Sequence, residues 1–106
     1  YGTPLLEGQI LLRLGRYAEG MAAFREALAR AEGVERGYVL HEMGAAALDH
    51  GAYLEAEEYL EALLREEGYP YQAQALADLA EALYRQGRYQ EAEGMAQRAM
   101  HQGAEA

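Results

Sequence analysis

The chain has 106 residues, enough for one domain with a buried core, and its composition is dominated by helix-forming Ala, Leu, Glu and Arg. Its formal net charge of −9 at pH 7 opposes binding to nucleic-acid phosphates and anionic lipid surfaces. Because it has no Cys, Ser or Lys, it lacks disulfides, Ser or Cys nucleophiles, Schiff-base lysines and phosphate-binding P-loops.

The first two predicted helices cover residues 4–14 and 17–32. Thr3 before Pro4 is typical of an N-cap followed by proline at the first helical position. Apolar and small residues recur at helical spacing on both sides of Gly15, which separates the two helices. We therefore expect the two helices to fold back on each other as a hairpin.

Two further helical pairs follow, with helices predicted over 36–49, 53–67, 71–86 and 89–102. A glycine divides each pair, at Gly51 and Gly87. Gly33 and Gly68 stand where the second helix of a pair is expected to end, and Pro70 can open the helix that follows. Six helices joined by short glycine-containing turns make three hairpins.

One phrase recurs at the turn of each hairpin with a spacing of 36 residues: GRYAEG at 15–20, GAYLEA at 51–56 and GRYQEA at 87–92. The glycine permits a backbone conformation that costs other residues about 1 kcal/mol. The tyrosine begins the second helix, and we expect its ring to wedge against the first helix of the same hairpin. The glutamate lies in the first turn of that helix, where the helix dipole favours a carboxylate. We interpret the phrase as architecture rather than chemistry.

On these residues the chain resembles the tetratricopeptide repeat family. The family signature combines large apolar residues, a Leu-Gly pair, a glycine–x–tyrosine turn and a closing Ala. The second repeat matches it best, at Leu40, Met43, Gly44, Gly51, Tyr53, Ala56 and Leu60. The resemblance covers essentially the whole chain, although the period is 36 residues instead of the usual 34 or so.

The resemblance implies an all-α fold in a single domain over residues 1–106. This fold is an α-solenoid of three antiparallel helix–turn–helix hairpins, with six helices wound into a right-handed superhelix. The repeats would run approximately over 1–34, 35–69 and 70–106.

The resemblance also implies a non-catalytic protein–protein interaction module, which binds a peptide or helix of a partner in the concave groove lined by the first helix of each pair. Carried over position by position, the groove residues are Leu5, Gln9, Leu12, Arg13, Tyr38, His41, Leu48, Asp49, Gln74, Glu81, Tyr84 and Arg85, together with Gly2, Ala45 and Ala77. Tyrosines and arginines often anchor interfaces. The alternative is that these side chains are solvated, with Glu81 and Arg85 as an i, i+4 pair. The chain lacks the Lys and Asn with which one branch of the family clamps chaperone tails, so such a tail is not an expected ligand.

Self-assembly is the alternative function. No capping helix is predicted after Met100, and an uncapped solenoid exposes an apolar end face that favours a homo-oligomer. A regulatory segment of a larger protein is a further alternative, because the chain starts at Tyr1 rather than Met.

No cofactor, metal or catalytic activity is expected. His41 and His50 lie nine residues apart, about half a turn out of phase, so one helix does not direct both at one ion. No apolar run is long enough to cross a membrane and no signal peptide is visible, which favours a cytoplasmic location.

Overall fold

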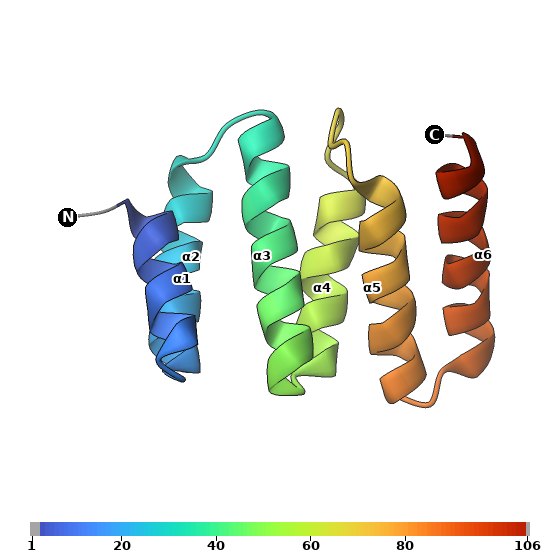
Figure 1. Ribbon diagram of the computed structural model, residues 1–106, viewed down its shortest axis with the longest axis horizontal. Coiled ribbons are helices and arrows are strands. Elements are labelled where there is room, and N and C mark those ends of the chain that lie inside the picture. Colours follow the sequence, from blue (N-terminus) through green and yellow to red (C-terminus); the bar gives the residue numbers. More distant parts are fainter. Residues whose placement is uncertain (1–2, 106) are drawn as a thin grey trace.

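In the computed structural model, which describes residues 3–105, all six predicted helices are present. They are α1 (Pro4–Arg13), α2 (Tyr17–Arg30), α3 (Val34–His50), α4 (Tyr53–Leu64), α5 (Gln72–Arg85) and α6 (Tyr89–Glu105). Figure 1 shows the helices following one another in chain order along the long axis of the molecule. Each hairpin pairs two consecutive helices, and α2 packs on α3 and α4 on α5 to join them. With no strand between residues 3 and 105, the predicted all-α solenoid of three hairpins is confirmed.

Capping residues set the start of α1 and the boundary between α2 and α3. The Thr3 side chain accepts a hydrogen bond from the backbone N–H of Leu6 at 3.2 Å, so Thr3 is the expected N-cap of α1. Gly33 does not end α2, however. That helix stops at Arg30, and Gly33, with a φ of 60°, is the N-cap of α3.

The connection over residues 65–71 differs from the prediction (Figure 1). Helix α4 ends at Leu64 rather than at residue 67, and α5 begins at Gln72. Tyr69 explains the difference: it precedes Pro70, which disfavours helical backbone, and its ring is only 5% exposed because it turns into the core. Gly68, with a φ of 80°, allows the backbone to make that turn. The helix therefore stops early so that Tyr69 can pack inward.

Two helix glycines let the paired helices of a hairpin approach closely. A Cβ added at Gly8 would lie 2.9 Å from the ring of Phe24, and one at Gly44 would lie 2.7 Å from Cδ2 of Leu60. Both large side chains are fully buried. The first helix of each of these two hairpins thus gives up a side chain so that the second can fill the core.

The recurring tyrosine meets the expected helix in only one of its three copies. The ring centroid of Tyr89 lies 5.3 Å from that of Tyr84 in α5, the first helix of the same hairpin, as expected. The other two copies have partners in the next hairpin. The ring of Tyr17 stacks on His50 of α3, and the hydroxyl of Tyr53 accepts a hydrogen bond from Arg85 of α5 at 3.4 Å. In both cases the partner belongs to the first helix of the next hairpin. The reason is geometric: the tyrosine begins the second helix of its hairpin, and that helix packs against the next hairpin along the chain.

We predict that Gly44→Ala destabilises the protein by about 1–3 kcal/mol, because the new methyl group has to displace the fully buried Leu60. The matched control is Gly94→Ala in α6, where an added Cβ meets nothing within 4 Å. That change should raise stability by about 0.5–1 kcal/mol through helix propensity. Urea unfolding followed by circular dichroism measures both, and equal effects for the two variants would contradict the close approach at Gly44.

Candidate partner-binding groove

A groove of about 380 Å³ lies on the first-helix side of the solenoid, and we call it the tyrosine groove. It is lined by Leu5 of α1, by four residues of α3 and by two tyrosines of the segment before α5: Leu5, Tyr38, His41, Glu42, Ala45, Tyr69 and Tyr71. All three hairpins thus contribute to it or border it. The predicted groove residues Leu5, Tyr38 and His41 are brought together here.

Three tyrosine rings form one edge-to-face cluster in this groove. The ring centroids of Tyr38 and Tyr69 lie 5.4 Å apart, those of Tyr69 and Tyr71 lie 5.8 Å apart, and those of Tyr38 and Tyr71 lie 6.2 Å apart. Such arrangements match the positive edge of one ring to the negative face of another. Tyr69 is buried, whereas Tyr38 is 41% and Tyr71 is 56% exposed. Tyr69 therefore forms the floor of the cluster, and the other two rings offer apolar surface to a ligand.

A chain of hydrogen bonds fixes the polar side of the groove. The two ring nitrogens of His41 are both engaged, Nδ1 by the hydroxyl of Tyr69 and Nε2 by Oδ2 of Asp78 at 2.9 Å. The other carboxylate oxygen, Oδ1, accepts from Nε2 of Gln74 at 2.9 Å. Because a carboxylate only accepts, Nε2 of His41 donates to Asp78 in this pair. The network ties α3, the 65–71 connection and α5 together.

Burial raises the pKa of Tyr69 to about 12, and the neighbouring Tyr38, Tyr71, Asp78 and Glu42 act in the same direction. The hydroxyl therefore stays protonated at neutral pH beside Nδ1 of His41. The floor of the groove is accordingly a fixed, uncharged ring.

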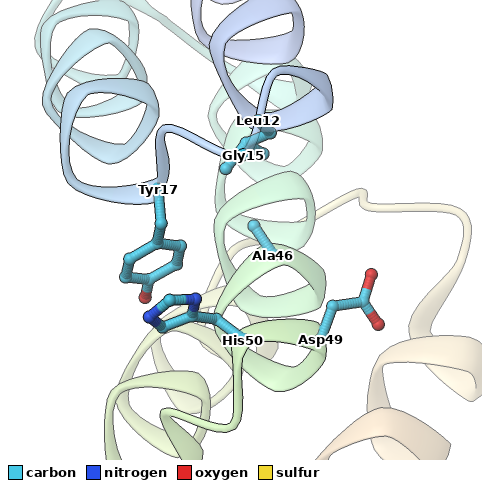
Figure 2. Close-up of a pocket in the computed structure, with 6 residues that line it drawn as sticks. All are labelled: Leu12, Gly15, Tyr17, Ala46, Asp49 and His50. Carbon is cyan, nitrogen blue, oxygen red and sulfur yellow. The ribbon is translucent and has the colours of Figure 1, made fainter.

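Leu12 and Asp49 lie in a different cavity, of about 210 Å³, at the turn end of the first two hairpins. Figure 2 shows the ring of Tyr17 lying against the imidazole of His50, while Asp49 points away from the pair. The two ring centroids are 3.8 Å apart and nearly parallel, at 3°. The Tyr17 hydroxyl donates to Glu55 at 3.4 Å, and burial, followed by the charge of Glu55, raises the pKa of Tyr17 to about 12.

The predicted residues of the third hairpin lie elsewhere again. Glu81 and Tyr84 line a cavity of about 430 Å³ between α5 and α6. Arg85 forms an ion pair with Glu81 at 3.4 Å and donates a hydrogen bond to the hydroxyl of Tyr53 at 3.4 Å, so both of these partners are within the same molecule. Gln74 joins the tyrosine groove only through Asp78.

Five predicted positions contribute little to the tyrosine groove or cannot be placed in it. Leu48 packs beside the buried Ala47, Gln9 is half-buried and Arg13 is exposed. Ala77 is exposed as well. Gly2 lies outside the described residues.

The sequence prediction missed two groove tyrosines, Tyr69 and Tyr71. The sequence analysis uses the stretch GYPY at residues 68–71 only to mark the boundary between two helices, because Gly68 and Pro70 are turn residues. For Tyr69 the signal is nevertheless present, because Pro70 disfavours helical backbone at the residue before it. The groove residues were assigned from positions on the first helix of each pair, so a residue outside those helices could not be found in this way.

Comparison with known proteins supports the repeat. A family model described as "Tetratricopeptide repeat" matches residues 5–35 and 41–106, most of the chain. A search of curated proteins found no match. Between residues 3 and 105 no three His, Asp or Glu side chains are grouped to hold a metal ion. None of the helices in that range combines the length and apolar character needed to cross a membrane.

We predict an alkaline stability loss that depends on Tyr69. Its pKa is about 12 when folded against an ordinary value of 10.0, so the protonated ring stabilises the fold fully below pH 10. That contribution is lost as the pH rises from about 10 to about 12, and the midpoint of thermal unfolding should fall across this interval. Tyr69→Phe should flatten the fall only in part, because Tyr17 contributes over the same range.

Circular dichroism melts at a series of alkaline pH values measure this dependence. Tyr71→Phe is the matched control, since it removes a tyrosine of the same cluster whose ring is more than half exposed. A Tyr69→Phe variant whose melting midpoint falls with pH as steeply as the parent protein's would contradict the assignment.

Proposed function

Because the chain belongs to the tetratricopeptide repeat family, whose repeats generally mediate protein–protein interaction, we propose that it is a non-catalytic module that binds a peptide or helix of a partner protein in the tyrosine groove. The observation that carries the proposal is the tyrosine cluster, in which a buried ring holds two half-exposed rings in place. Tyrosine offers a large contact area with few rotatable bonds, and a fixed ring loses little entropy on binding.

The charges around the groove indicate the chemistry of the partner. Glu42 is exposed beside the rings, Asp78 lies behind His41, and the whole chain carries a net charge of −9. A cation is attracted both by these carboxylates and by the face of a tyrosine ring. We therefore propose a partner segment with an apolar anchor for the groove and a Lys or Arg beside it.

We predict that peptides selected from a random library on the immobilised protein are enriched in Lys and Arg next to an apolar residue. Tyr38→Ala should weaken their binding by about tenfold or more, because it removes a ring at the centre of the contact. Glu42→Gln should weaken binding less, and mainly at low salt, because the carboxylate is exposed and screened.

Fluorescence anisotropy with a labelled selected peptide gives the dissociation constants. Leu54→Ala is the control, because Leu54 is an apolar side chain of α4 that is 62% exposed and lies outside the groove. If Tyr38→Ala and Leu54→Ala bind the peptides equally well, the tyrosine groove is not the binding site.

Self-association is a second candidate function, and a specific observation favours it. Apolar side chains are exposed on the helices at both ends of the described solenoid: Leu6, Ile10 and Leu14 at one end, and Tyr89 and Met100 at the other. Exposed apolar surface of this kind is typical of protein interfaces.

A further inference from the structure

The groove between α5 and α6 of the third hairpin corresponds to a groove of the second hairpin that α5 fills. On the second hairpin, α5 covers the corresponding surface of α4, so that Ala56 is fully buried and Glu57 is only 7% exposed. Thirty-six residues later, Ala92 and Glu93 line an open cavity of about 430 Å³. Its walls are mainly apolar, from Ala80, Tyr84, Tyr89, Ala92 and Ala96.

The filled groove shows which contacts such a junction uses. Nη1 of Arg88 binds both carboxylate oxygens of Glu57, at 2.7 and 2.9 Å. Arg88 is itself held by Glu91, at 3.0 and 2.6 Å. Beside this pair, the guanidinium of Arg85 lies 6.0 Å from the ring centroid of Tyr53. The junction between α4 and α5 is therefore an ion pair flanked by a cation–ring contact.

Both halves of that junction recur at opposite ends of the chain. At the shift of 36 residues, α6 carries Tyr89 and Glu93 in place of Tyr53 and Glu57. At a shift of two repeats, α1 ends at Arg13 in place of Arg85, and the turn that follows carries Arg16 in place of Arg88. Arg16 is held by Glu19 at 2.8 and 2.6 Å, in the geometry in which Glu91 holds Arg88.

The apolar position at the centre of the filled junction also has a counterpart on α1. Ala82 of α5 packs there with Ala47 and Ala56 of the second hairpin. At the shift of two repeats its place is taken by Ile10, which is 48% exposed.

The junction between the first two hairpins is chemically different. The position of Glu57 is occupied there by Met21, which is 1% exposed, and the position of Arg88 by Ala52. That junction has no ion pair at this point. The two ends of the chain therefore match the α4–α5 junction and not the α2–α3 junction.

We propose that the groove between α5 and α6 takes α1 of a second copy of this chain, in the register in which α5 packs on the second hairpin. Arg16 of one copy then binds Glu93 of the other, and Arg13 lies over Tyr89. This inference rests on self-association, the second candidate function, and deepens it by naming the two faces and their register. Because the faces differ, the contact is heterologous and each copy can add another.

The test is the weight-average mass, measured by sedimentation and light scattering over a wide concentration range. The parent protein should grow steadily in mass with concentration, without stopping at a dimer. Arg16→Glu and Glu93→Arg should each weaken association by about tenfold or more, because each places like charges in the junction. Glu61→Arg makes the same change in charge on the exposed surface of α4 and should leave the mass curve unchanged.

An equimolar mixture of the Arg16→Glu and Glu93→Arg proteins provides the decisive arm. Each junction between the two variants again pairs opposite charges, so association should return to the level of the parent protein. A folding defect in either variant would not be repaired by mixing, and circular dichroism of each variant alone checks its helix content.

Three results would overturn the inference in distinguishable ways. If the protein is a monomer at all concentrations, both self-association and the proposed register are excluded. A dimer of fixed mass that responds to Glu93→Arg but not to Arg16→Glu indicates two α6 faces in contact, which leaves self-association standing and removes the register. Variants that are weakened singly but not rescued by mixing remove the Arg16–Glu93 contact.

Discussion

Each hairpin of this protein has an apolar surface that its own two helices do not cover, and the rest of the structure depends on this constraint. Ala47 of the second hairpin and Ala82 of the third are both fully buried and belong to one apolar cluster that joins the two hairpins. Burial of such surface contributes roughly 25 cal/mol per Å², which is the main force available to a chain without disulfides. Hairpins therefore stack in chain order, and the contact between neighbours is as much a part of the core as the contact within a hairpin.

Stacking has a direct consequence for the candidate binding surface. When hairpins stack, their first helices come side by side, and residues that are far apart in sequence share one groove. Leu5 and Tyr38 meet in this way, and the connection over 65–71, between the second and third hairpins, adds Tyr69 and Tyr71. The link from His41 to Asp78 crosses the same junction. The groove is thus assembled by the packing of hairpins and is as rigid as that packing.

The fold could be predicted almost completely from the sequence, because its signals are local. Glycine turns, the Thr3 cap and helical periodicity each depend on a few neighbouring residues, and all six helices follow from them. The groove could be predicted only in part. Tyr69 packs inward because of space between α3 and α5, a property of the assembled hairpins that no local pattern contains. The stacking partner of Tyr17 could not be predicted for the same reason, because His50 is in another hairpin.

Apolar burial alone does not decide which hairpin surfaces pack together, because the same period and turn phrase recur in all three hairpins. The side chains at each junction supply the distinction. Glu57 is nearly buried, and a carboxylate removed from water destabilises the protein unless an opposite charge meets it. In the observed stacking Arg88, in the turn of the third hairpin, meets it at 2.7 Å, whereas the turn of the second hairpin, which has Ala52 at that position, would leave it unpaired. Met21 occupies the position of Glu57 on the first hairpin, and it has no charge with which an arginine at the position of Arg88 could pair. A buried ion pair that adds little net stability can therefore still specify which hairpin surfaces pack together. A wrong pairing would leave Glu57 buried without a partner, and this would destabilise the protein by more than the correct ion pair stabilises it.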